Sequence, residues 1–105
     1  MADPWIEKFL QEAVPRLVEK FKVQRLILFG SRVEGTASED SDIDAIVVSD
    51  EFENIPFLKR SPLLLKTVRF GRHIDFLCYY PEQFERIKKN SSIIADALEH
   101  GLAAI

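Results

Sequence analysis

The chain has 105 residues, enough for one domain (residues 1–105) with a single buried core. Its formal net charge of −3 argues against a general electrostatic grip on DNA or RNA, so no stable nucleic-acid binding is expected. No apolar run approaches the roughly 20 residues of a membrane span, and no signal-peptide pattern opens the sequence. The single cysteine, Cys78, cannot form an internal disulfide, so we expect a cytoplasmic protein without membrane attachment.

The first expected elements are a helix and a short strand. Asp3-Pro4 is typical of a helix start, with Asp3 as the N-cap and Pro4 in the first helical position. Apolar residues then recur at helical spacing as far as Phe21, and Pro15 is expected to kink or divide this helix. An apolar strand follows at residues 24–29.

The middle of the chain is expected to alternate between strands and helices. One helical turn over residues 31–34 ends at Gly35, and a polar loop leads to a strand at 42–48. An acidic, irregular connection precedes a helix over residues 57–68. A hairpin is the competing interpretation there, because residues 67–70 also resemble a strand.

The last expected elements are a strand at residues 73–80 and two helices. The alternation of this strand puts His73 and Asp75 on one face, and we assign His73 a surface or packing role rather than a catalytic one. Pro81 opens a helix, and Ser91 or Ser92 caps a final one that ends at His100. The segment 49–72 is long enough for a crossover, which would place the strands on either side of it parallel and adjacent.

The polar residues that follow the first strand carry the clearest chemical signal. That strand ends in Gly30-Ser31, and after ten further residues the next strand opens with Asp42-Ile43-Asp44. Two carboxylates two residues apart project from one face of a strand, separated by about two rises of 3.3 Å. Carboxylates suit Mg²⁺ bridged to phosphate, and the backbone N–H groups of the Gly-Ser turn favour an anion. This pattern is typical of phosphoryl or nucleotidyl transfer.

The pattern resembles the signature of the nucleotidyltransferase superfamily that includes DNA polymerase β. It is most similar to the minimal nucleotidyltransferases, which are often partnered with HEPN-domain proteins. Gly30-Ser31-Arg32, Gly35 and the tetrapeptide Ser41–Asp44 stand where that branch has them, and a third strand carries a lone acid, Asp75. The resemblance covers nearly the whole chain. It implies a polymerase β palm-like α/β (α+β) fold, a small mixed sheet of three to four strands with helices packed on one side.

The resemblance also implies a role for each motif residue. Asp42, Asp44 and Asp75 would be the catalytic residues and would bind two metal ions, Mg²⁺ or Mn²⁺, with ATP as the substrate. Asp75 would also help to deprotonate the attacking hydroxyl. The residues that would bind the nucleotide are Gly30, Ser31, Arg32 and Ser41.

The bare sequence leaves other roles open for three of these nucleotide-binding residues. Ser31 could be the N-cap of a short helix, which is compatible with a phosphate contact. Arg32 could pair with the triphosphate or with the carboxylate of Glu34 or Glu39. Ser41 could simply cap the entry to the second strand.

Three functional hypotheses follow. The leading one is an enzyme that moves a nucleoside monophosphate, AMP from ATP, to a hydroxyl. The resemblance suggests that it is the antitoxin of a toxin–antitoxin pair and modifies a tyrosine of a HEPN-domain toxin. The second is a non-catalytic antitoxin or scaffold that neutralises such a partner by binding alone. The third is a stand-alone transferase acting on a small molecule.

Overall fold

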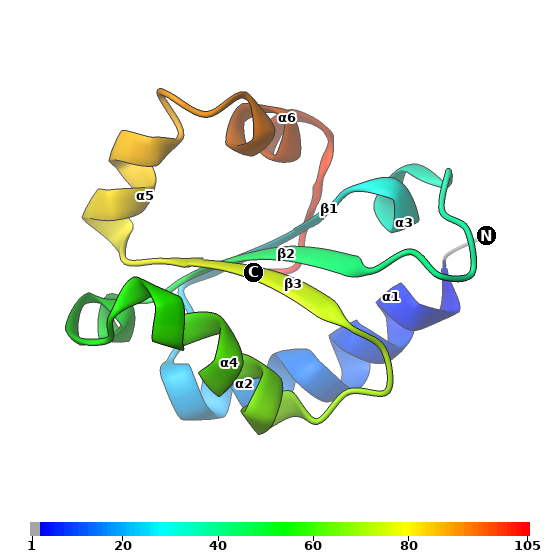
Figure 1. Ribbon diagram of the computed structural model, residues 1–105, viewed down its shortest axis with the longest axis horizontal. Helices are drawn as coiled ribbons and strands as arrows, with labels where there is room; N and C mark the ends of the chain where they lie inside the picture. The colour runs from blue at the N-terminus through cyan, green and yellow to red at the C-terminus, as the bar shows by residue number, and fades with distance from the viewer. Residues whose placement is uncertain (1–2) are drawn as a thin grey trace.

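The computed structural model describes residues 3–105, which form a mixed α+β fold (Figure 1). The sheet is four-stranded, with the strand order β3-β2-β1-β4. Its strands are β1 (Arg25–Phe29), β2 (Ile43–Val48), β3 (Ile74–Tyr79) and β4 (Leu102–Ala103). The helices are α1 (Pro4–Lys8), the π-helical η1 (Phe9–Ala13), α2 (Val14–Phe21), α3 (Ser31–Glu34), the 3₁₀-helical η2 (Asp50–Asn54), α4 (Phe57–Val68), α5 (Pro81–Ile87) and α6 (Ser92–His100).

The sheet is mixed, as the sequence predicts. Strand β2 pairs antiparallel with β1 and parallel with β3, and β1 also pairs antiparallel with β4. The parallel pair requires a crossover, which η2 and α4 supply. Helix α4 spans Phe57–Val68 as predicted, and the competing hairpin is wrong. The helix continues through Thr67 and ends where Arg69 takes a left-handed conformation, with φ of 47°.

The N-terminal helix begins and is interrupted as predicted. The Asp3 carboxylate accepts the N–H of Trp5 at 2.8 Å, which caps α1. Pro15 has no N–H to donate and its ring crowds the preceding turn, so the regular α-helical hydrogen bonding is disturbed there. The structure accommodates Pro15 at the start of α2, directly after the wider π-helical turn η1. The chain therefore keeps one apolar face, formed by Phe9, Ala13 and Leu17, against the sheet.

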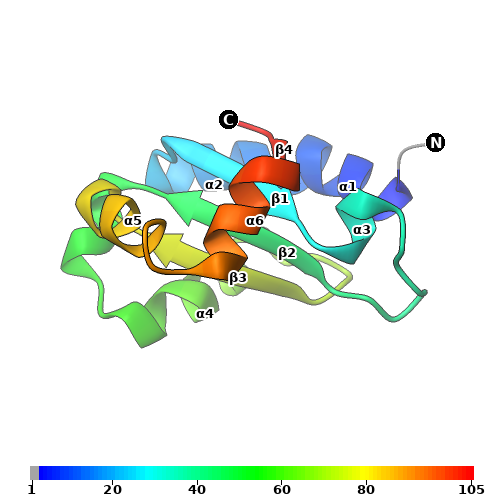
Figure 2. The same ribbon diagram turned by 90° about the horizontal axis from the view of Figure 1, so that it is seen from above.

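Helices cover both faces of the sheet, which corrects the prediction that they pack on one side (Figure 1). Leu26 and Leu28 of β1 face the core formed with η1, α2 and α4. Ile27, between them, faces a second core with Phe84 of α5 and Ile94 of α6. Figure 2 shows α6 lying across β1 and β2. The strands are apolar on both faces, as strands buried on both sides must be.

The chain end adds the strand β4, which the sequence analysis missed. Ser91 caps α6 by accepting the N–H of Ile94 at 3.3 Å, and the helix ends at His100 as predicted. A Cβ on Gly101 would collide with the carbonyl oxygens of Ala97 and Leu28, so only glycine fits this close approach. The chain then turns back along β1 for two paired residues. Within residues 3–105, none of the helices combines the length and apolar character needed to cross a membrane.

Candidate active site

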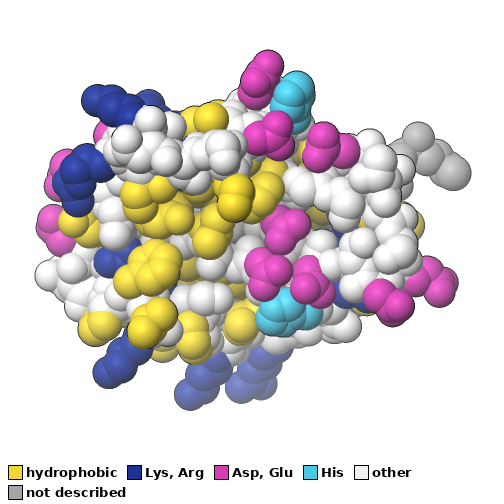
Figure 3. All heavy atoms as spheres, turned by 45° about the horizontal axis from the view of Figure 1, so that its top comes forward, with side chains coloured by type: hydrophobic (Ala, Val, Ile, Leu, Met, Phe, Trp, Pro, Cys, Tyr) yellow, Lys and Arg dark blue, Asp and Glu magenta, His cyan; other side chains and the backbone are white. Residues whose placement is uncertain are grey.

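Three carboxylates meet at one end of the sheet, on the face that also carries α5 and α6. Asp44 of β2 and Asp75 of β3 are direct partners in the parallel register, and Asp42 lies one residue before β2. Their neighbours Ile43 and Ile74 point into the core on the opposite face. The convergence expected from a crossover between two parallel strands is therefore present. Figure 3 shows acidic side chains gathered beside a histidine on this surface.

Gly30 makes room for one of these carboxylates. It directly follows β1 with φ of 86° and ψ of −167°, a conformation that is essentially restricted to glycine. A Cβ on Gly30 would collide with Oδ2 of Asp44, so the turn and the carboxylate occupy adjoining space. The Gly-Ser turn and the Asp-x-Asp motif, separated in sequence, thus form one site.

Asp44 lies in a strongly acidic environment. The pKa of Asp44 is raised from 3.8 to about 6, first by burial and then by the charges of Asp75 and Asp42 and a hydrogen bond with Asp75. The cluster therefore resists full ionisation when nothing neutralises it. Oxygen ligands from three carboxylates at one sheet edge are the donor set that divalent cations of the Mg²⁺ class take, so the residues fit the metal that the family implies.

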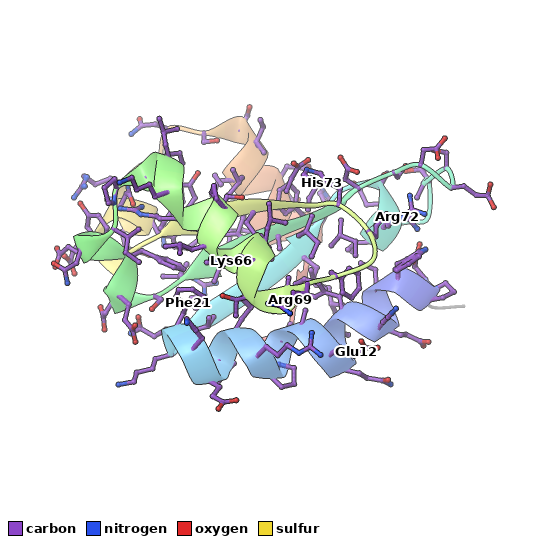
Figure 4. All side chains as sticks on the ribbon, turned by 60° about the horizontal axis from the view of Figure 1, so that its bottom comes forward. Glu12, Phe21, Lys66, Arg69, Arg72 and His73 are labelled. Carbon is purple, nitrogen blue, oxygen red and sulfur yellow. The ribbon has the colours of Figure 1, made fainter. Side chains whose placement is uncertain are left out.

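His73 belongs to this group, although the sequence analysis gave it a surface or packing role. Its Nε2 lies 3.0 Å from Oδ1 of Asp75, and both side chains are exposed. One ligand atom from each of Asp42, His73 and Asp75 lies within 4.8 Å of the others. Arg72, the residue before His73, is not part of this group. Its guanidinium carbon lies over the Trp5 ring, 5.1 Å from the ring centroid (Figure 4). The alternation that puts His73 on the face of Asp75 was the available signal.

Arg32 has protein partners on every side, and neither Glu34 nor the Glu39 carboxylate is among them. The guanidinium is buried and forms an ion pair with Asp3 at 2.9 Å. Its Nε donates to the Ser41 carbonyl at 2.7 Å, and its Nη2 donates to the Glu39 carbonyl at 2.9 Å and to that of Ser38. The side chain thus holds the loop that leads into Asp42.

The two serines of the motif occupy different settings. Ser31 stands at the first position of α3, while Gly30 occupies the N-cap that the alternative interpretation gave to Ser31. The Ser41 hydroxyl accepts the N–H of Ser38 at 3.0 Å, which tightens the loop before β2. Both serines are half-buried; Ser41 directly precedes Asp42 in the chain, and Ser31 directly follows Gly30.

The site lies at an open end of the sheet, where strands β2 and β3 begin, and not in a closed cavity. Side-chain exposure at Asp75 reaches 56%. A cavity of about 440 Å³ lies elsewhere, between α1, α3 and β4, and its lining includes Asp3, Arg32 and Val33. An open edge leaves space for an acceptor as large as a protein side chain with its surrounding surface.

Comparison with known proteins assigns the chain to a family. The family model described as a nucleotidyltransferase domain matches residues 10–103, nearly the whole chain. The chain belongs to the nucleotidyltransferase family. This match confirms the predicted family and the prediction that the chain is an enzyme of that class.

Two relatives are similar in sequence to this nucleotidyltransferase. A Methanocaldococcus jannaschii protein, provisionally named a protein adenylyltransferase, is 36% identical over 98 residues, covering 90% of this chain and 93% of that protein. The protein adenylyltransferase MntA of Thermococcus cleftensis is 45% identical over 72 residues, covering 69% of this chain and 64% of MntA.

Solved structures confirm the fold of the nucleotidyltransferase. A candidate nucleotidyltransferase of Sulfolobus solfataricus superposes with a TM-score of 0.61 at 20% identity, over 94% of this chain and 84% of that one. A chain of a toxin–antitoxin complex with AMP-PNP superposes with a TM-score of 0.50 at 20% identity, over 100% and 73%. At these identities the likeness concerns the fold alone.

Proposed function

We propose that this nucleotidyltransferase moves AMP from ATP to a hydroxyl group of a protein. The observation that carries the proposal is the convergence of Asp42, Asp44 and Asp75 beside the Gly30 turn, in a chain of this family. The choice of a protein as acceptor is supported by the two relatives that are named protein adenylyltransferases. The openness of the sheet edge is compatible with an acceptor of that size.

In this proposal the three carboxylates hold divalent cations, Mg²⁺ or Mn²⁺, through oxygen ligands. Such cations, when bound, neutralise the phosphate charge and stabilise the attacking and leaving oxygens of an in-line displacement. The backbone of the turn at Gly30 and Ser31 contacts the phosphates. Arg32 and Ser41 act on the nucleotide indirectly, because their polar groups already hold the loop before Asp42.

The transfer conserves atoms and charge in a single displacement. The acceptor hydroxyl oxygen forms a bond to the α-phosphorus of ATP, the bond from that phosphorus to the bridging oxygen breaks, and pyrophosphate leaves. The hydroxyl proton passes to the carboxylate of Asp75, which is the most exposed of the three carboxylates, with 56% of its side chain exposed. Asp44, half-buried against Gly30, stays in place as a ligand.

The proposed acceptor is a tyrosine hydroxyl of a HEPN-domain toxin, with this chain as its antitoxin in the cytoplasm. Support comes from the relative named MntA and from the toxin–antitoxin complexes among proteins of the same fold. The net charge of −3 is compatible with docking to a basic partner.

Neutralisation by binding alone is the second candidate function. The observation that favours it is a set of exposed apolar side chains, with Leu58 at 85% exposure and Ile93 at 62%. Side chains of this kind are available for contact with a partner protein. Binding alone needs no transfer, so an isotope experiment separates the two functions.

The test uses the chain with its co-purified partner and ATP labelled either in the α- or in the γ-phosphate. We expect the α-label to appear on the partner and the γ-label to leave as pyrophosphate. Asp44→Asn should abolish labelling, whereas Asp50→Asn, a change at the opposite end of β2, should preserve it. Partner bound without α-label in the wild type would favour the second candidate.

A further inference from the structure

The pair formed by His73 and Asp75 differs from the other histidine contact of the chain. His73 lies just before β3, two residues from Asp75, and its Nε2 is 3.0 Å from Oδ1 of Asp75. His100, the second of two histidines, lies on α6 with carboxylate oxygens of Asp96 and Glu99 at 3.8 and 3.9 Å. Both histidines are exposed to a similar extent, 56% and 53% of the side chain. Exposure alone therefore does not account for the closer approach at His73.

The spacing of the ligand atoms suits one cation. Two ligands at right angles around an ion, with bonds of about 2.1 Å, lie about 3.0 Å apart, and opposite ligands lie about 4.2 Å apart. The distance of 3.0 Å between Nε2 of His73 and Oδ1 of Asp75 matches that of two ligands at right angles. The ligand atom of Asp42 completes a set whose members all lie within 4.8 Å of one another. One imidazole nitrogen and two carboxylate oxygens thus lie close enough together to bind a single ion.

We propose that His73 is a direct ligand, together with Asp42 and Asp75, of one divalent cation. Imidazole favours transition metal ions, whereas Mg²⁺ takes oxygen ligands and water. The His73 nitrogen therefore biases this position toward an ion such as Co²⁺ over Mg²⁺. The inference rests on the proposed function, because the cation is the one that we assign to Asp42 and Asp75 there.

The test measures metal binding without nucleotide or partner, so it does not depend on transfer. Co²⁺ and Mg²⁺ affinities are compared for the wild type, His73→Ala and the matched control His100→Ala. His73→Ala should weaken Co²⁺ binding at least about tenfold and change Mg²⁺ binding by less than about threefold. His100→Ala should leave both affinities unchanged. His73 is exposed, and thermal unfolding of each variant verifies that the fold is retained.

The imidazole signals provide a second measurement on the wild type. The chain has two histidines, so two sets of ring resonances are expected. Substoichiometric Co²⁺, which is paramagnetic, should shift and broaden the ring signals of His73 far more than those of His100. The same addition to Asp75→Asn should shift neither.

Two results would overturn the inference. Equal weakening of Co²⁺ and Mg²⁺ binding in His73→Ala would mean that His73 only orients Asp75. Unchanged Co²⁺ binding in His73→Ala would mean that the contact between His73 and Asp75 is only a surface ion pair. Failure of AMP transfer with Co²⁺ binding intact would instead contradict the proposed function and leave His73 as a ligand.

Discussion

Gly30 is the residue at which backbone conformation and chemistry depend on one another. Its φ of 86° favours glycine, and a Cβ there would collide with the Asp44 carboxylate. Gly35 also has a positive φ, 82°, but its ψ of 13° is that of the left-handed helix, whereas the ψ of −167° at Gly30 lies outside that region. A Cβ on Gly35 would meet open space, so a side chain there tests a positive φ without a collision, whereas one at Gly30 adds a more restricted backbone and the collision with Asp44.

We predict that Gly30→Ala abolishes binding of the Mg²⁺ that Asp44 helps to hold, because the added methyl displaces the Asp44 carboxylate. Gly35→Ala should destabilise the protein by about 1 kcal/mol, the cost of a left-handed conformation for an ordinary residue, and preserve Mg²⁺ binding. Mg²⁺ titration and urea unfolding of both variants provide the measurement. Equal metal affinities for the two variants would contradict the role given to Gly30.

The raised pKa of Asp44 predicts that the stability of the metal-free protein depends on pH. Its pKa is raised from 3.8 to about 6, so between these values the folded protein holds a proton that the unfolded chain has released. The free energy of unfolding therefore falls as the pH rises through this window. Allowing for the partial exposure of Asp44, the fall amounts to about 1 kcal/mol.

The variant Asp44→Asn should lack this fall. With a chelator present, it should be more stable than the wild type at about pH 7, and the difference should shrink at about pH 4. Urea unfolding at both pH values measures this, with Asp50→Asn as the control. If Asp44→Asn were less stable than the wild type at both pH values, burial and repulsion would not dominate at Asp44.

At the residue scale, the sequence identifies the carboxylates but not all of their surroundings. Asp42, Asp44 and Asp75 are found by spacing, because strand periodicity and a crossover suffice to bring them together. His73 is placed on the face of Asp75 but given a surface or packing role, because alternation places a residue on a face and does not say how close its ring approaches a neighbour. That distance depends on side-chain rotamers, which a sequence pattern does not determine.

At the scale of elements, Arg32 links α1, α3 and the loop before β2. Its ion pair with Asp3 joins it to the N-cap of the first helix, and its other donors hold the carbonyls of Glu39 and Ser41. Sequence spacing could not reveal these partners. Asp3 is 29 residues distant, and backbone carbonyls exist at every position, so no residue pattern distinguishes the ones that accept.

We predict that Arg32→Met lowers the free energy of unfolding by about 3 kcal/mol, because it leaves the Asp3 carboxylate without its partner. The released loop, residues 36–41, should become the first site of limited proteolysis. The control is Arg86→Met, which removes an exposed arginine hydrogen-bonded to the Tyr80 hydroxyl at 3.2 Å. If the loop resisted protease equally in both variants, the role of Arg32 in holding the loop would be contradicted.

The elements also mark where local signals suffice. Asp3 and Ser91 cap their helices as predicted, because capping depends on neighbours within three residues. The placement of α5 and α6 on the second face depends on long-range packing, and the sequence analysis placed all helices on one side. The apolar runs of β1 and β2 indicate that helices cover both faces of the sheet, because a strand that is apolar on both faces is buried on both sides. Two residues of β4 are too few for any periodicity.

At the scale of the whole molecule, the fold presents an acidic site at one open end of the sheet and leaves apolar side chains exposed on two helices. Leu58 and Ile93 are exposed on helices that cover opposite faces of the sheet. A partner docked on either face could bring a hydroxyl to the edge. We therefore propose that this chain binds and activates ATP and that the partner protein supplies the acceptor hydroxyl.

The most direct test of this account is the intact mass of the protein that co-purifies with the chain, before and after incubation with Mg²⁺ and ATP. We predict that the partner gains one or more AMP masses with the wild type and none with Asp44→Asn, although both chains still bind it. A partner that remains bound and never gains mass, or one that gains mass equally with Asp44→Asn, would contradict nucleotidyl transfer at this site.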